Sequence, residues 1–325
     1  MRVLVTGSEG FIGSHLVELL TTEGHDVVAG VQYNSFGRMG WLEEINLQDH
    51  VDVSLFDVRD YDMCKQLTSR VDAVIHLAAL IGIPYSYKAI SSYLETNVLG
   101  TKNICQASLD SGIEKVLVAS TSEVYGSALF VPITENHPLQ AQSPYSASKI
   151  AADAIATSYS CSFGLPVTIF RPFNSYGPRQ SRRAIISNVI AQCLSESDVI
   201  KVGNTSPTRD FTYVKDTSRG IIELLTHSAS PGEVFNIGTG SEISVSSLID
   251  LIQEIIGTNK SVVQEIKRVR PSNSEVLRLV CDSSKLESAT GFRAITGLRE
   301  GLEKTVEWFR LKKTNWYYQG TSFVE

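Results

Sequence analysis

The chain has 325 residues, of which 42% are hydrophobic and 20% charged, so it can form one large or two smaller globular domains. Its formal net charge of −6 argues against nucleic acid as a partner, and the histidine spacing indicates no metal site. Five scattered cysteines without a CxxC pair, no recognisable signal peptide and no membrane-spanning run predict a cytoplasmic protein that is not bound to a membrane.

Short apolar runs alternate with helical patterns in the first half of the chain. Strands are predicted at 2–7, 26–31, 51–58, 72–79, 115–120 and 166–172, with helices at 13–24, 86–112 and 144–163. Continuous rather than alternating apolar strands indicate a parallel sheet that is covered on both faces, hence a doubly wound α/β fold. After residue 172 the elements become shorter, with helices at 244–257 and 298–313, which predicts a smaller C-terminal substrate-binding lobe.

A glycine-rich loop, "TGSEGFIG", lies between the first strand and the first helix. Gly7, Gly10 and Gly13 permit a tight turn and let backbone N–H groups approach a pyrophosphate at the helix N-terminus. The spacing is GxxGxxG rather than GxGxxG. Its position after the first strand of a βα array predicts a dinucleotide site.

The end of the second strand, "GVQYNSFGR", lacks the acidic residue that usually holds the adenosine ribose. Gln32, Asn34 and Ser35 are candidates for binding the ribose hydroxyls, whereas Arg38 would suit a 2′-phosphate. Because no basic residue follows the strand immediately, we favour NAD and leave NADP open. Asp57, after the third strand, is placed either to accept from the adenine amino group or to cap the next helix.

Tyr145 and Lys149, in "SPYSASK", are four residues apart and share one face of a helix. A phenol is a poor base at neutral pH, but a neighbouring ammonium and an oxidised nicotinamide lower its pKa. Tyr145 can then take a proton from a sugar hydroxyl while hydride leaves the same carbon.

Taken together, these motifs resemble the extended short-chain dehydrogenase/reductases, in the nucleotide-sugar epimerase/dehydratase group. The resemblance covers nearly the whole chain and includes "HLAA" (76–79), "TNVLGT" (96–101), "STSEVYG" (120–126), "RPFNSYGPRQ" (171–180) and "RDFTYVKD" (209–216). It implies an NAD-binding Rossmann domain over 1–172, with about 209–235 returning to it, and a lobe over 173–325 that binds an NDP-sugar. It also implies a homodimer through the helices at 86–112 and 144–163.

The resemblance assigns further roles to individual residues. Thr121 hydrogen-bonds the sugar O4, Tyr145 is the base, and Lys149 lowers its pKa. The cofactor is further contacted by Phe11, Ile12, Val58, Leu77, Ala78, Ala79 and Asn97, of which Asn97 supports the active-site backbone. Substrate contacts are expected from Ser86, Tyr87, Asn174, Arg179, Arg209 and Glu275.

Glu123 stands two residues after Thr121, and a 4-epimerase has no need of such a carboxylate. A 4,6-dehydratase does need one, because oxidation at C4 acidifies the C5 hydrogen, which a base removes as water leaves C6. Many hexose dehydratases of the group have Thr-Asp-Glu, whereas this chain has Thr-Ser-Glu. A serine is a weak acid, so we expect Ser122 to orient the 6-hydroxyl and the protonated Glu123 to deliver the proton.

Two stretches, "VQYNSFGRMGWL" (31–42) and "AALIGIPYSY" (78–87), are similar to 4,6-dehydratases acting on UDP- or GDP-N-acetylglucosamine, including the legionaminic-acid-pathway type. The resulting hypothesis is an NAD-dependent dehydratase of that substrate class. The alternatives are a UDP-glucuronate decarboxylase, which shares the Thr-Ser-Glu triplet, an NDP-sugar 4-epimerase, and a non-catalytic dinucleotide sensor. The intact set of Thr121, Glu123, Tyr145 and Lys149 argues against the sensor.

Overall fold

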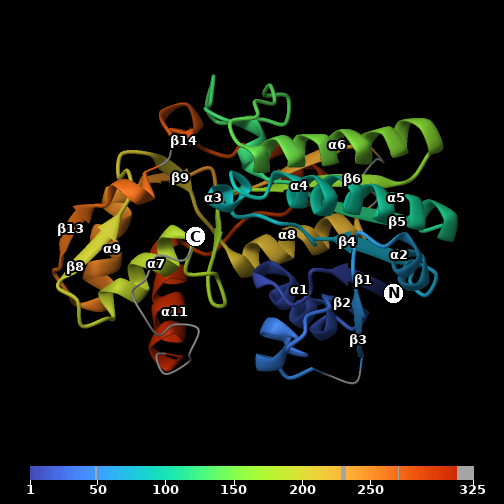
Figure 1. The fold of residues 1–325 in the computed structure, drawn as a ribbon, viewed down its shortest axis with the longest axis horizontal. Coiled ribbons are helices and arrows are strands. Elements are labelled where there is room, and N and C mark those ends of the chain that lie inside the picture. The colour runs from blue at the N-terminus through green and yellow to red at the C-terminus, as the bar shows by residue number, and fades with distance from the viewer. Residues whose placement is uncertain (48–49, 228–231, 270, 313–325) are drawn as a thin grey trace.

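A seven-stranded parallel sheet forms the centre of the larger lobe in the computed structural model, which describes residues 1–47, 50–227, 232–269 and 271–312 (Figure 1). The strand order is β11-β6-β5-β4-β1-β2-β3. The strands are β1 (Arg2–Thr6), β2 (Asp26–Gln32), β3 (Val51–Phe56), β4 (Ala73–His76), β5 (Lys115–Ala119), β6 (Val167–Pro172) and β11 (Val234–Ile237). The doubly wound parallel fold predicted from the continuous apolar strands is confirmed.

Helices cover both faces of this sheet, because its strands are apolar on both sides. In β1, Val3 and Val5 pack into one core cluster and Leu4 into another. The first cluster includes α1 (Phe11–Thr22) and α8 (Val214–Thr226). The second includes α2 (Tyr61–Thr68), α5 (Gly100–Ser111) and α6 (Pro144–Phe163).

The stretch predicted as a helix at about 86–112 is helical without a break from Ile90 to Ser111, but a separate short helix precedes it and the continuous part is not regular. The elements are α3 (Ile83–Ser86), α4 (Ile90–Tyr93), a π-helical turn over Leu94–Leu99, and then α5. The side chain of Asn97, inside the π-helical turn, hydrogen-bonds both the N–H and the carbonyl of Leu80. This pair of contacts ties the irregular turn to the loop after β4. Helical turns of this π type frequently occur at functional sites.

The smaller lobe has its own hydrophobic core and three small sheets (Figure 1). Its sheets pair β7 with β10, β8 with β13, and β9 with both β12 and β14. The strands are β7 (Ser175–Tyr176), β8 (Val199–Val202), β9 (Thr208–Asp210), β10 (Thr212–Tyr213), β12 (Glu242–Ser244), β13 (Ser261–Gln264) and β14 (Arg278–Leu279). The helices packed with them are α7 (Ile185–Cys193), α9 (Val245–Ile256) and α11 (Leu298–Leu311).

The chain crosses between the two lobes more than once after residue 172. Helix α8 packs on α1, and β11 pairs with β6 at the edge of the main sheet. Helix α10 (Ser284–Thr290) then packs against β11. No helix among the described residues is both long and apolar enough to cross a membrane.

Candidate active site between the two lobes

The motif "STSEVYG" follows the carboxyl end of β5, at the centre of the sheet, where doubly wound folds place their ligands. Thr121 begins a 3₁₀ turn over Ser122–Tyr125, and its hydroxyl accepts a hydrogen bond from Glu123 N at 3.2 Å. Ser122 is buried, whereas Glu123 is partly exposed. The strand end therefore brings the hydroxyl and the carboxylate together in one turn.

Helix α6 begins with a capping box, in which the side chains of Ser143 and Ser146 each bind the backbone N–H of the other. Pro144 occupies the first helical position, where its missing N–H costs nothing. This well-defined start places Tyr145 and Lys149 in the first two turns, where both side chains are buried.

Tyr145 forms a hydrogen bond with Thr121, which lowers the pKa of the phenol, but burial has the larger effect and raises that pKa above its usual value. The negative charge of Glu123 adds to the rise. The structure thus brings together Thr121, Glu123 and Tyr145. Because the phenol is held neutral, a base function requires an added positive charge, such as that of an oxidised nicotinamide.

Lys149 donates to the carbonyl oxygen of Ala119 at 2.6 Å. Burial lowers the pKa of its ammonium below the usual value, and the charge of Asp153 opposes that effect. Oδ2 of Asp153 accepts from Ser120 Oγ at 2.8 Å and from two guanidinium nitrogens of Arg171. We expected Lys149 to lower the pKa of Tyr145, but Lys149 is not among the groups that shift the pKa of this phenol. A buried carboxylate thus supports the lysine.

A chain of buried hydrogen bonds connects β1 with α6. Thr6 Oγ1 accepts from the N–H groups of Leu77 and Ala78, so its hydroxyl proton points to His76 Nδ1, 2.8 Å away. The other ring nitrogen, Nε2, then donates to Thr101 Oγ1 at 3.2 Å, and that hydroxyl donates to the carbonyl of Asn97 at 2.6 Å.

This series of hydrogen bonds continues with Asn97 Nδ2, which donates to Ser148 Oγ at 2.9 Å. The Ser148 hydroxyl in turn donates to the Tyr145 carbonyl at 2.7 Å. Burial lowers the pKa of His76 to about 3, which keeps the ring neutral, as this arrangement of donors requires.

The glycine loop approaches the end of β4 closely. Gly7 has a φ of 70°, and a Cβ there would lie 3.0 Å from the Ala78 backbone. A Cβ on Gly13 would lie 2.2 Å from the carbonyl oxygen of Gly7. Only glycine fits either position, so the loop can lie close to the start of α1, where a helix N-terminus favours a pyrophosphate. Gly10, Phe11 and Ile12 lie in this same turn.

The polar residues after β2 have local partners. The Asn34 amide bonds the backbone of Phe36 and Arg38 within its own turn. The Arg38 guanidinium is bound by the Glu43 carboxylate at 2.6 Å. Ser35 lies in the same turn as Asn34, and the backbone N–H of Gln32 donates to Glu9 Oε1 at 3.0 Å.

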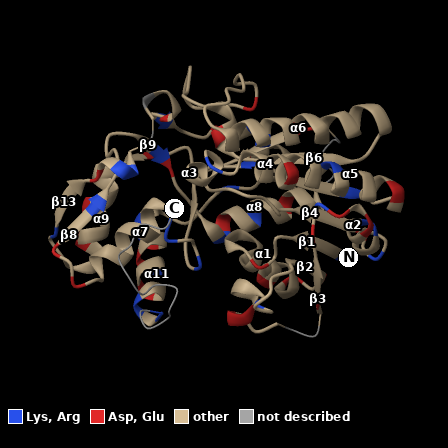
Figure 2. Cartoon of the chain, in the orientation of Figure 1, with Lys and Arg blue, Asp and Glu red and all other residues tan. Residues whose placement is uncertain are grey.

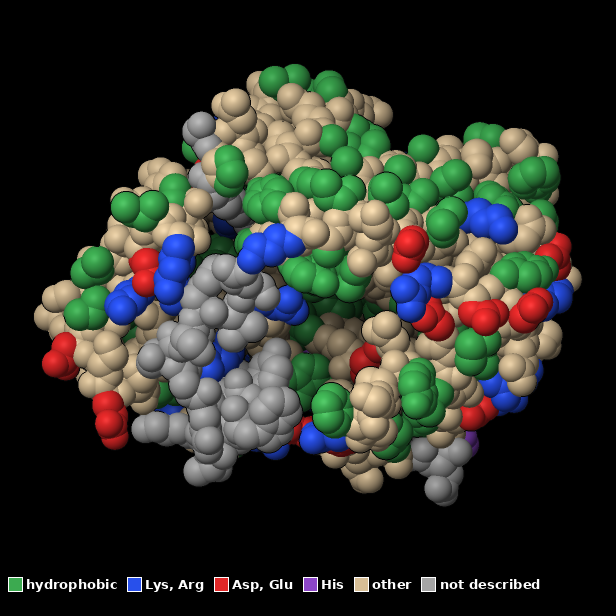
Figure 3. All heavy atoms as spheres, in the orientation of Figure 1, with side chains coloured by type: hydrophobic (Ala, Val, Ile, Leu, Met, Phe, Trp, Pro, Cys, Tyr) green, Lys and Arg blue, Asp and Glu red, His purple; other side chains and the backbone are tan. Residues whose placement is uncertain are grey.

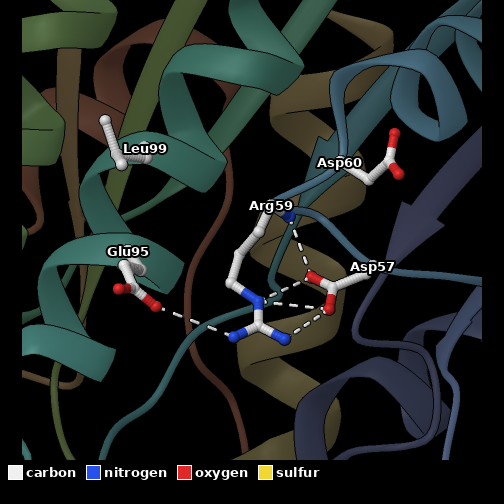
Figure 4. A pocket seen from close by; sticks show the side chains of 5 residues that line it. All are labelled: Asp57, Arg59, Asp60, Glu95 and Leu99. Atoms are coloured by element: carbon white, nitrogen blue, oxygen red, sulfur yellow. Dashed lines mark hydrogen bonds and ion pairs between the residues drawn. The ribbon is translucent and has the colours of Figure 1, made fainter.

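Asp57 lies at an open surface pocket of about 400 Å³ that is also lined by Arg59, Asp60, Glu95 and Leu99 (Figure 4). Its carboxylate accepts from the Arg59 guanidinium and backbone N–H, and the hydrogen bond with the Arg59 side chain lowers the pKa of Asp57. The alternative that Asp57 caps α2 is wrong, because the N-cap is Asp60, which accepts from Met63 N. Val58 packs beside this pocket, in the core.

The loop expected to contact the sugar reaches the smaller lobe. Tyr87 Oη lies 2.6 Å from Ser274 Oγ, which itself donates to the Gln142 carbonyl at 2.7 Å. Ser86 is fully buried, and its hydroxyl donates to the Ile83 carbonyl. Leu77 and Ala78 meet Thr6 through their N–H groups, and Ala79 follows in the same loop.

Arg209, on β9, pairs with Glu275 at 3.6 Å, and both side chains are largely buried. The Asn174 amide donates to the Asp210 carbonyl at 3.4 Å, next to Arg209, and Phe173 is fully buried. Arg179 pairs instead with Glu18 of α1. Basic positions appear on β9 and on nearby segments of the smaller lobe in Figure 2, and Lys and Arg side chains line one side of the hollow between the lobes in Figure 3.

Several residues that hydrogen-bond within or beside this site were not singled out from the sequence: Thr6, Glu9, His76, Ser120, Asp153 and Arg171. Asp153 lies four residues after Lys149, a spacing that indicates a shared helix face. Glu9 lies inside the glycine loop, where an acidic residue was a usable signal. The other four depend on contacts between distant segments.

The family model for GDP-mannose 4,6 dehydratase matches residues 4–305. A dTDP-glucose 4,6-dehydratase of Actinoplanes sp. is 32% identical over 97% of this chain and 100% of its own length. A UDP-N-acetyl-alpha-D-glucosaminuronate decarboxylase of Bacillus cytotoxicus is also 32% identical, over 95% of this chain and 98% of its own.

A solved structure of the dTDP-glucose 4,6-dehydratase DesIV from Streptomyces venezuelae, with NAD and TYD bound, superposes with a TM-score of 0.90. It is 31% identical and covers 97% of this chain and 99% of that one. The match of the family model, together with relatives of this identity and coverage, shows that the chain belongs to the GDP-mannose 4,6 dehydratase family.

Proposed function

We propose that this chain is an NAD-dependent nucleotide-sugar 4,6-dehydratase and that its substrate is UDP- or GDP-N-acetylglucosamine. The observation that carries the proposal is the cluster of Thr121, Glu123 and Tyr145, in which a carboxylate accompanies the hydroxyl and the phenol. An elimination requires that carboxylate, whereas epimerisation at C4 does not. Solved relatives contain NAD, and the glycine loop has the close backbone approach that a dinucleotide requires.

NAD, when held by the glycine loop, would supply the acceptor for the C4 hydride and the donor of the hydride that C6 receives. Tyr145 takes the proton of the 4-hydroxyl, and Thr121 orients that hydroxyl through the same hydrogen-bonding group that contacts Tyr145. Lys149, held by the Ala119 carbonyl, is proposed to offset the negative charge of the phenolate as it forms. Glu123 removes the C5 proton and protonates the departing C6 hydroxyl, which Ser122 orients.

The nucleotide part of the substrate is expected in the smaller lobe. Arg209 is suited to a diphosphate by its forked donors, and Glu275, its partner in the structure, to a ribose of the nucleotide. Asn174 and Arg179 are proposed on the substrate side, together with Ser86 and Tyr87. The contact of Tyr87 with Ser274 brings this loop against the segment that holds Glu275.

Incubation with UDP- or GDP-N-acetylglucosamine without added reductant should give a 4-keto-6-deoxy sugar, and deuterium at C4 should appear at C6. Mass spectrometry of the products from several NDP-sugars reads out both. If neither nucleotide gives such a product, the substrate proposal fails.

Decarboxylation is the second candidate, supported by the Thr-Ser-Glu triplet and by the decarboxylase relative. In that case UDP-glucuronate should release carbon dioxide, and the N-acetylglucosamine substrates should remain unchanged. A 4-epimerase would return an isomer with deuterium still at C4.

We also propose a cytoplasmic homodimer formed through α4, α5 and α6. Ile90 and Leu94, four residues apart, are about half exposed. A second copy of this chain would cover that apolar strip. Light scattering of the purified chain should give twice the monomer mass, and Leu94→Glu should give the monomer.

A further inference from the structure

The carboxylate at the end of β2 belongs to Glu9 of the glycine loop and not to a residue of the strand itself. Dinucleotide-binding sheets usually hold the adenosine ribose with an acidic residue at the end of the second strand, and here that position is Gln32. Glu9, from the glycine loop, reaches the same place, where its Oε1 accepts from Gln32 N at 3.0 Å. The side chain belongs to another segment, the loop after β1, but its carboxylate lies at the same end of β2.

The segment Gly40–Glu44 holds Glu9 in this position. Trp41 N donates to the Glu9 carbonyl at 3.0 Å, and a Cβ on Gly40 would lie 2.7 Å from that carbonyl oxygen and 2.9 Å from Glu9 Cβ. The second carboxylate oxygen, Oε2, is buried without a hydrogen-bond partner. Burial also raises the pKa of Glu9. A buried acceptor left unpaired is unfavourable, so the site is incomplete without a donor.

We propose that Glu9 selects the cofactor, by accepting a hydrogen bond from the adenosine ribose hydroxyls of NAD and repelling the 2′-phosphate of NADP. The inference rests on the proposed dinucleotide cofactor but not on the identity of the sugar. It assigns to the glycine loop the role that the second strand has in other dinucleotide sites.

The contacts of Arg38 also favour NAD over NADP. Arg38 is the residue that would suit a 2′-phosphate, but its Nε donates to both oxygens of Glu43, at 2.9 and 2.8 Å. Glu43 is held in turn by the backbone N–H of Met39 at 2.7 Å. A phosphate at this corner would meet Glu9 and compete with Glu43 for the guanidinium.

The test is calorimetric titration of the full-length chain, stripped of bound nucleotide, with NAD⁺ and NADP⁺ separately. Wild type should prefer NAD⁺. In Glu9→Gln, which can still accept from Gln32 N, the affinity for NADP⁺ should rise about tenfold or more, because a like charge is removed. The affinity for NAD⁺ should change less than that.

Glu44→Gln is the matched control, because Glu44 lies in the neighbouring segment and pairs with Lys312 at 2.9 Å, so the same charge is lost without a change at β2. Glu9→Ser provides a second variant if Glu9→Gln does not fold, with the same expected rise for NADP⁺. If the variants keep the wild-type preference, or if wild type binds both nucleotides equally, the role of Glu9 is overturned. If neither nucleotide binds, both the role of Glu9 and the proposed dinucleotide cofactor are wrong. If the nucleotides bind as expected but no sugar is converted, only the proposed reaction is wrong.

Discussion

The ammonium of Lys149 lies 2.6 Å from the carbonyl oxygen of Ala119, the last residue of β5. The strand that leads to Thr121 and the helix that holds Tyr145 are therefore joined by the lysine itself. Because Thr121 follows this strand and Tyr145 lies on the same helix as Lys149, a displacement of the strand end should also displace the helix start.

Tyr145→Phe should reduce turnover by about 10²–10⁴-fold, because the phenol is the proposed proton acceptor from the sugar. Its fold should remain, since the helix start depends on Ser143 and Ser146. Steady-state assays and thermal unfolding measure the two effects.

Tyr125→Phe is the matched control in the opening motif. The Tyr125 hydroxyl bonds Arg171 and Asn236 at 2.9 and 2.7 Å and is fully buried. Its loss should lower the free energy of unfolding by about 1–3 kcal/mol while chemistry continues. Equal activity losses in the two variants would contradict the assignment of the base.

Glu123→Gln should stop the elimination but not the first oxidation. The expected result is slow formation of reduced nicotinamide on adding the sugar, without a 4-keto-6-deoxy product. Absorbance of the reduced cofactor and mass spectrometry of the sugar are the measurements. Ser122→Ala, next to it, should only slow the reaction, and a variant Glu123→Gln with full dehydratase activity would remove the basis of the proposed function.

Asp153→Asn should destabilise the protein by about 3–5 kcal/mol, because it leaves the buried Arg171 guanidinium without its charge partner. The pair is separated by 2.9 Å and nearly inaccessible. Urea unfolding measures the change. Adding Arg171→Met should recover part of the stability, whereas Glu300→Gln, in an exposed pair with Lys304, should cost less than about 0.5 kcal/mol.

The stability of the protein should fall as the pH falls below about 6.5. The folded pKa values of His76 and His15 are about 3, in both cases mainly because of burial. Since the unfolded state binds these protons first, stability is complete above the unfolded pKa and is lost as the pH falls toward 3.

His76→Asn should therefore reduce the slope of unfolding free energy against pH by about 1.4 kcal/mol per unit between the two pKa values. Urea unfolding at several pH values measures the slope. Ile104→Val, a buried change without a titrating group, should lower stability by about 1 kcal/mol at every pH. An unchanged slope in His76→Asn would exclude His76 as the titrating group.

The sheet was accessible from the sequence because parallel strands buried on both faces have continuous apolar centres, as β1 and β5 do. Helix α6 was predicted with the observed ends, Pro144 and Phe163, because serine and proline mark its start and Gly164 its end. Local chemistry determines these features.

The π-helical turn at Leu94–Leu99 was not predicted, because it depends on the contact of Asn97 with Leu80, a residue of another segment. The partner of Asp57 likewise depends on how the loop after β3 folds. In that loop Arg59 binds the Asp57 carboxylate, and Asp60 instead of Asp57 caps α2. Hydrogen-bond partners between distant segments have no signature in a single sequence.

The pairing of β11 with β6 has a consequence for synthesis on the ribosome. When residue 172 has emerged, six strands of the main sheet are available, but the outer edge of β6 has no partner until residues 234–237 follow. The intervening chain includes α7 and the strands β7 to β10 of the smaller lobe, so part of that lobe must be made before the sheet is complete. An open, apolar sheet edge invites pairing with other nascent chains. We therefore expect truncations between residues 172 and 237 to aggregate rather than to yield a smaller folded protein.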